Sequence, residues 1–177
     1  NPPKVFEARE DFQYCTKMNF EHAEGMRVWW KLEKNSGYSH DAQIKICDQV
    51  IDGKSYAEVI KNEFISKKGS SLYMKARSLA ESNLDDAYSV LERSLAENLR
   101  SFVYFEAQGM DSVQLFQHSR NTAFLLIQYG LRLDFDAILV KSIRKMLKGF
   151  DEVPVPLYEP LLQLVLSFKA ERIKSKK

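Results

Sequence analysis

The sequence predicts an all-α fold, a single compact bundle of about seven to nine helices around a long central helix at residues 84–108. No proline occurs from Lys4 to Val153, so helices of any length can run through the middle of the chain. Apolar residues recur at spacings of three and four, the period of a helix, and no segment alternates as a strand does. The 7 Gly and 5 Pro among 177 residues are about half the usual share, which excludes a loop-built protein.

Five helices are expected before residue 83, bounded by residues that cap or break helices. Asn19 is expected to cap the second helix, Asp52-Gly53 to stop the third, and Ser55 with Glu58 to form a capping box for the fourth. A break is expected where Lys67-Lys68-Gly69-Ser70 interrupts the pattern. The resulting segments are 4–18, 19–35, 40–51, 55–64 and 71–82.

The segment 84–108 carries the clearest helical signal. Asn83 is its expected N-cap, and Gly109 is expected to supply the left-handed residue at its end. At 1.5 Å per residue the helix would be about 37 Å long. Its apolar seam steps alternately by four and three along Leu84, Tyr88, Leu91, Leu95, Asn98, Phe102 and Phe105.

Three further elements are expected after this helix. Asp111 should cap a helix over 112–129 that Gly130 closes, and Asp134 should open another over 134–150. Residues 151–156 are expected to be an extended connector to a last helix that starts at Pro160. We expect residues 1–177 to form one helical domain, and because the chain begins at Asn1 and not at Met, it is open whether it belongs to a longer protein.

Charge and cysteine content constrain the class of protein. The 26 basic and 24 acidic residues leave a net charge of +2, which is too balanced for the concentrated basic face that duplex binding needs. Cys15 and Cys47 have no CxxC spacing, so we expect reduced thiols in an intracellular, cytoplasmic protein, with a single bridge as the alternative. The apolar runs are far shorter than the ~20 residues of a membrane-spanning helix.

No motif for catalysis, a cofactor or a metal is found, and none of these is expected. His22, His40 and His118 lack the spacing of a metal site. Asp134 and Asp136 form a DxD pair, which we assign to helix capping because it stands at a predicted helix start. Phosphate-binding glycine loops and GxSxG elbows are absent from the sequence. An enzyme of unknown class is therefore only the third functional hypothesis.

Several side chains are candidates for binding a protein partner. Trp29 and Trp30 point about 100° apart on a helix, so either the helix is buried on two sides or one indole lies at an interface. Asn98, on the apolar seam, either selects a partner or makes an internal hydrogen bond. Arg120 pairs either with Glu106 or with an acid of a partner. The last group of candidates is the apolar face of the basic C-terminal helix, represented by Phe168.

Residues 40–82 offer an alternative, a degenerate helix-turn-helix. The order helix, turn, short capped helix and third helix fits that outline, although Glu63 stands where an apolar residue is usual. In this hypothesis the protein is a transcriptional regulator that binds DNA. The contacts would come from Lys67, Lys68, Lys75 and Arg77.

The leading hypothesis is a non-enzymatic helical module, for protein interaction or regulation, that binds a protein partner. Binding would use a groove between helices or the aromatic and C-terminal surfaces described above. A homodimer or larger assembly is also compatible with the sequence, nucleic acid is the alternative partner, and a membrane surface is not expected.

Overall fold

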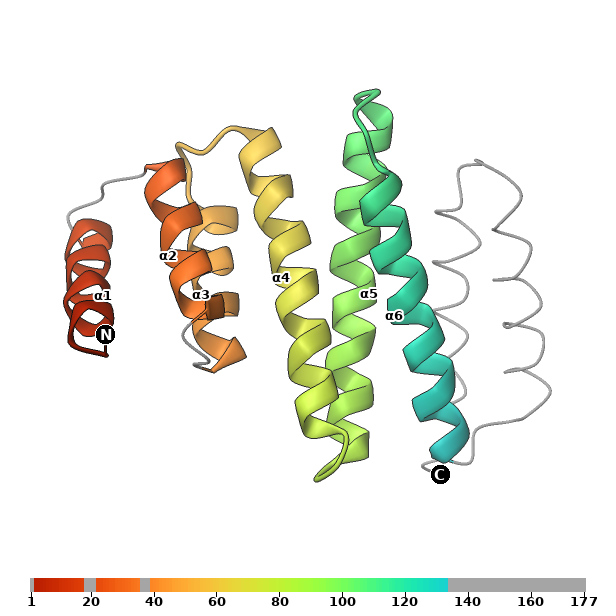
Figure 1. Cartoon of the computed structure of the whole chain (residues 1–177). Coiled ribbons are helices and arrows are strands. Elements are labelled where there is room, and N and C mark those ends of the chain that lie inside the picture. Colours follow the sequence, from red (N-terminus) through yellow and green to blue (C-terminus); the bar gives the residue numbers. More distant parts are fainter. Residues whose placement is uncertain (1, 18–21, 36–38, 134–177) are drawn as a thin grey trace.

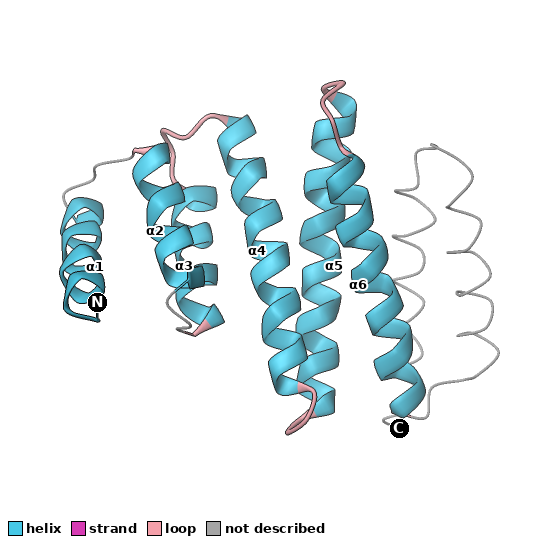
Figure 2. Ribbon diagram, in the orientation of Figure 1, coloured by secondary structure: helices cyan, strands magenta, loops and turns pink. Residues whose placement is uncertain are grey.

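The computed structural model describes residues 2–17, 22–35 and 39–133, and every regular element in these ranges is an α-helix (Figure 1). No strand occurs in them (Figure 2), so the all-α prediction is confirmed for this part of the chain. The expected helices at 134–150 and after Pro160, and the connector 151–156, lie outside the described residues. The described helices are α1 (Pro2–Lys17), α2 (Ala23–Asn35), α3 (His40–Asp52), α4 (Glu58–Leu79), α5 (Leu84–Ala107) and α6 (Val113–Arg132).

The described helices stand side by side in a row, from α1 at one end to α6 at the other (Figure 1). Each helix packs chiefly against its neighbour in the chain, and the α4–α5 contact is the most extensive. The expected long helix, α5, therefore lies between α4 and α6 and is not ringed by the other helices in this part of the molecule. The count also differs, since these ranges hold six helices where seven to nine were expected for the whole chain.

Two apolar clusters stabilise the row, and α4 belongs to both. The first joins Trp29 and Trp30 of α2 to residues of α3 and to Phe64 near the start of α4. The second joins Ala76 near the end of α4 to α5 and α6. The predicted seam of α5 lies on the buried side of that helix. Tyr88, Leu91, Leu95, Asn98 and Phe102 are buried, and Leu84 and Phe105 at its two ends are half-buried.

The predicted break at residues 67–70 is wrong, because α4 runs through this segment without interruption. Gly69 lies in the middle of the helix, where α4 crosses α5. A Cβ atom at Gly69 would lie 2.2 Å from Oδ1 and 2.8 Å from Cγ of Asn98, so only glycine allows this close approach. Ser94 of α5 donates a hydrogen bond to the carbonyl oxygen of Gly69 at 2.7 Å. The capping box is also wrong, because α4 starts at Glu58 after Ala57, which makes no side-chain cap.

Other helix ends follow the local sequence. Asn83 caps α5 by accepting a hydrogen bond from the Asp86 amide at 3.1 Å. Gly109 has the expected positive φ of 65°, and the Met110 amide donates to the Phe105 carbonyl at 3.0 Å, as in a Schellman motif. Asp111 accepts a hydrogen bond from the first amide of α6 at 3.1 Å.

Two expected boundaries are displaced. Gly130 does not end α6, which continues to Arg132. The second helix begins at Ala23, and its first turn is capped by His22, whose Nδ1 accepts a hydrogen bond from the Gly25 amide at 3.0 Å. The expected cap, Asn19, lies outside the described residues.

Candidate functional site

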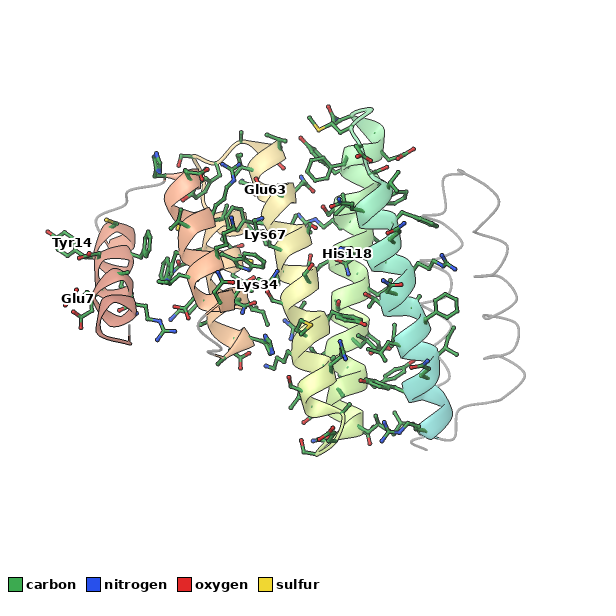
Figure 3. The ribbon with its side chains drawn as sticks, in the orientation of Figure 1. Glu7, Tyr14, Lys34, Glu63, Lys67 and His118 are labelled. Atoms are coloured by element: carbon green, nitrogen blue, oxygen red, sulfur yellow. The ribbon has the colours of Figure 1, made fainter. Side chains whose placement is uncertain are left out.

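The candidate site is a groove of about 430 Å³ that crosses the middle of α4. Residues of α2 and α3 line one side of the groove, and residues of α5 and α6 line the other side. Residues 70–74 of α4 lie between the two sides. In Figure 3, Lys34 lies on the α2 side of α4 and His118 on the α6 side. The lining residues are Trp30, Lys34, His40, Gln43, Ser70, Ser71, Tyr73, Met74, Asn98, His118, Asn121 and Thr122.

The groove combines an aromatic wall with neutral polar groups and positive charge. Trp30 and Tyr73 supply aromatic surface, and Met74 is 45% exposed. Lys34 is the lysine in the lining, two histidines accompany it, and none of the twelve lining residues is an aspartate or a glutamate. A volume of this size lies within the range of about 300–1,000 Å³ found for ligand sites.

Hydrogen bonds between helices fix several lining side chains. The Asn98 amide nitrogen donates to Thr122 Oγ1 at 3.3 Å, and that hydroxyl donates to the His118 carbonyl at 2.8 Å. On the other side, Ser71 Oγ donates to Gln43 Oε1 at 2.9 Å. The groove is therefore largely preformed, because these bonds connect α5 with α6 and α4 with α3.

Three buried polar atoms of lining residues have no hydrogen-bond partner: Trp30 Nε1, His40 Nδ1 and Asn98 Oδ1. Asn98 Oδ1 is the atom that lies against Gly69, where a weak Cα–H contact is the available interaction. The other two atoms are ring nitrogens on the α2 and α3 side. A buried donor without an acceptor costs about 1–3 kcal/mol, so an acceptor that reached the Trp30 indole would recover that free energy.

The two adjacent tryptophans of α2 contact different neighbouring helices, and both are buried. Trp29 stacks on Phe12 of α1 with ring centroids 5.9 Å apart and donates to Glu33 at 3.3 Å. Trp30 faces α4, where the Lys67 ammonium lies 5.0 Å from its ring centroid. The interpretation of a helix buried on two sides is confirmed. Both indoles belong to one apolar cluster.

Of the predicted partner-binding residues, the structure brings Trp30 and Asn98 together in the groove. Asn98 makes the internal hydrogen bond that one of the two interpretations required. The Arg120 guanidinium lies 5.5 Å from the Phe124 ring on the same helix, and Glu106, its expected partner, accepts a hydrogen bond from Ser112. Phe168 lies outside the described residues.

The four basic residues of the helix-turn-helix hypothesis all have partners within the protein. Because residues 58–79 form one helix, the expected outline of three short helices is wrong. A nucleic-acid phosphate would compete with these intramolecular contacts. They are Lys67 with Glu63 (3.2 Å), Lys68 with Asp48 (2.8 Å) and Glu97 (3.0 Å), Lys75 with Asp41 (2.5 Å), and Arg77 over the Tyr73 ring (6.0 Å).

Two of these ionised groups have shifted pKa values that agree with their contacts. Burial acts to raise the pKa of Glu63, but hydrogen bonds from Arg27 and the charge of Lys67 outweigh it and hold this pKa below its ordinary value. Burial acts to lower the pKa of Lys68, but Asp48 and Glu97 outweigh it and raise this pKa. Both groups are therefore charged at neutral pH and connect α4 to its neighbours.

Ten of the twelve lining residues, all except Trp30 and Asn98, were not predicted as site residues from the sequence. They are Lys34, His40, Gln43, Ser70, Ser71, Tyr73, Met74, His118, Asn121 and Thr122. A signal was present in α6, where His118 and Thr122 are four apart and thus share one helix face, and Thr122 precedes an apolar run. His40 and Gln43 are three apart and likewise share one face of α3, but their neighbours across the groove are distant in sequence.

Within the described ranges, no group of three or more His, Cys, Asp and Glu side chains could hold a metal ion. Both cysteines are free thiols, as expected. None of the helices in the part that the structure describes has the length and apolarity to cross a membrane. No known protein family matches the chain, and neither a curated protein nor a solved structure matches it at a significant level.

Proposed function

We propose that this chain is a non-enzymatic helical module that binds a protein partner in the groove across α4. The observation that carries the proposal is the groove itself. Hydrogen bonds between helices fix its walls on α3, α4, α5 and α6, and its aromatic surface adjoins the buried, unpartnered nitrogens of Trp30 and His40. A peptide segment supplies a carbonyl acceptor for the Trp30 indole, which can only donate, and side chains for the aromatic wall. Aromatic residues in a concave surface are also the type of anchor that interfaces favour.

The groove contains one pair that resembles catalytic machinery, Ser70 and His118. Ser70 Oγ and His118 Nδ1 are 3.4 Å apart, which is longer than the usual contact between a nucleophile and its base. Ser70 lies in the middle of α4, where helix hydrogen bonds already occupy the neighbouring amides, so these cannot form an oxyanion hole. The lining also lacks a carboxylate to orient the histidine. Binding is therefore favoured over acyl transfer.

Site-specific photo-crosslinking tests the proposal. A photoreactive phenylalanine analogue at Met74, in the groove, should crosslink the partner in extracts of the source, and the same analogue at Val28, which is similarly exposed on α2 outside the lining, should not. The purified partner should then bind the Asn121→Ala variant more weakly than the matched Gln128→Ala variant, since both residues are exposed on α6 but only Asn121 lines the groove.

Equal crosslinking from both positions, or equal affinity of the two α6 variants, would exclude the groove as the binding site. Duplex binding at low salt that disappears when Lys75 and Arg77 are replaced by alanine would instead support the DNA-binding alternative.

A further inference from the structure

The charges around the groove point to a specific chemistry in the partner. The lining contains one lysine and two histidines and lacks carboxylates. Three acids stand next to lining residues in the sequence, and each already has a basic partner: Glu33 pairs with Arg9, Asp41 with Lys75 at 2.5 Å, and Glu97 with Lys68 at 3.0 Å. A low-dielectric concave surface of one sign concentrates counter-charge, so the groove favours an anionic group.

Lys34 is the cation that remains free to bind this group. Its ammonium lies 5.3 Å from the Trp30 ring centroid, and its side chain is exposed at the groove. The ion pairs of the described residues do not include Lys34, whereas Lys67, Lys68 and Lys75 each pair with an acid. An exposed lysine on a flexible stem can leave the indole ring at little cost.

Trp30 supplies the second element of the site. This side chain is only 9% exposed, and its Nε1, a group that can only donate, has no acceptor. The His40 Nδ1 atom is buried and unpartnered in the same lining. Both nitrogens are closed to water, so a ligand reaches them only when a covering side chain moves. A carboxylate has two oxygens that can accept such bonds, and charge-assisted hydrogen bonds are stronger than neutral ones.

The amount of positive charge distinguishes a carboxylate from a phosphate group. A phosphorylated side chain carries a charge of about −1.5 to −2, and sites that recognise it use clusters of arginines. The lining has a single lysine and no arginine, which matches one carboxylate.

We propose that the groove receives the carboxylate of a glutamate or aspartate side chain in an extended segment of the protein partner, bound by Lys34 and Trp30. This inference rests on the proposed function, because it specifies which group of a partner enters the groove. Met74 and Tyr73 would then contact the apolar part of the same segment.

The test uses N-acetylated, C-amidated hexapeptide libraries with glutamate, glutamine or lysine fixed at a central position. The readout is the indole N–H resonance of Trp30 in a proton–nitrogen correlation spectrum of the whole chain, assigned with the Trp30→Phe and Trp29→Phe variants. The glutamate library should shift this resonance. The best peptide should bind about tenfold more tightly than its glutamine twin, the ratio expected for one charge-assisted hydrogen bond of 1.5 kcal/mol or more.

Two α2 variants locate the charge. Lys34→Ala should remove most of the preference for glutamate, while Lys31→Ala, an exposed lysine of the same helix outside the lining, should leave it unchanged. Lys34→Arg should retain it.

The outcomes separate this inference from the proposed function. If the glutamine twin binds equally well and still shifts the Trp30 resonance, the carboxylate inference is wrong and the groove remains a peptide site. A phosphoserine twin that binds more tightly than the glutamate peptide also overturns it. If no library moves the Trp30 resonance and crosslinking from Met74 captures no partner, both proposals fail.

Discussion

Replacing Gly69 with alanine should destabilise the protein, although the same change stabilises most helices. In an unobstructed helix interior, glycine to alanine gains about 1 kcal/mol. At Gly69 the added methyl would lie 2.2 Å from Asn98 Oδ1 and 3.3 Å from the Asn98 backbone nitrogen. Carbon and oxygen atoms in contact normally stay at about 3.3 Å or more, so the new methyl overpacks the contact between α4 and α5 and displaces the Asn98 side chain.

Both effects have a calculable cost, and the two costs add. Overpacking of a buried contact costs about 1–3 kcal/mol, and a moved Asn98 side chain loses its hydrogen bond to Thr122, 3.3 Å in the native protein, for about 1 kcal/mol more. After the gain in helix propensity is subtracted, we expect Gly69→Ala to lower the free energy of unfolding by about 1–3 kcal/mol. Urea denaturation followed by circular dichroism measures this as a lower midpoint with an unchanged slope.

Gly25→Ala is the matched control. It also lies within a helix, but its new methyl would meet only His22, at 3.6 and 3.9 Å, which is ordinary contact. This variant should therefore be as stable as the native protein or more stable by up to about 1 kcal/mol. The source of the clash is tested by repeating Gly69→Ala in an Asn98→Ala background, where most of the penalty should disappear. A Gly69→Ala variant that gains stability would refute the close approach of α4 and α5. A penalty that persists in full without the Asn98 side chain would refute that side chain as the source of the clash.

Two further predictions concern the first apolar cluster and its surroundings. In native buffer a thiol reagent should modify the exposed Cys15, while the buried Cys47 should react only after unfolding. Burial, assisted by the nearby Asp48, raises the pKa of the Cys47 thiol, so little reactive thiolate is present. Two fast-reacting thiols would contradict this packing. Arg9→Ala should cost about 3 kcal/mol, since it removes the guanidinium that pairs with the Glu33 carboxylate, a group only 2% exposed. Adding Glu33→Gln to that variant should restore much of the lost free energy of unfolding, as measured by urea titration. If Arg9→Ala alone has native stability, α1 does not dock on α2.

The helix ends were predicted correctly where the signal lies in the local sequence. The predictions were wrong where the decisive contact is with a residue far away in the sequence. The cap made by Asn83 and the left-handed Gly109 depend on residues a few positions apart, so the sequence contains all that is needed. Gly69 has the same local appearance as a helix end, yet its role depends on Asn98, which is 29 positions further along the chain. Without knowledge of the α4–α5 contact, a glycine beside two lysines cannot be recognised as an interhelical contact.

Two of the twelve residues that line the candidate site, Trp30 and Asn98, were predictable from the sequence, but the site itself was not. Trp30 and Asn98 were selected because a second adjacent tryptophan and a polar group on an apolar seam need an explanation. Their meeting in one groove depends on how α2, α4 and α5 pack, which periodicity does not encode. His40 and His118 lacked any local spacing that would relate them, so only the fold places both in the lining.

The groove and the stability of the chain depend on the same crossing of helices. Ser94 and Ser101 of α5 donate to carbonyl oxygens of α4, at 2.7 Å to Gly69 and 2.9 Å to Asn62, and Asn98 lies between them. These small or polar residues let the two helices approach closely and fix their register, which in turn positions the groove lining of α4 opposite α6. Gly69→Ala should therefore weaken partner binding as well as folding. Asn121→Ala, at the exposed edge of the groove, should weaken binding while the free energy of unfolding stays unchanged.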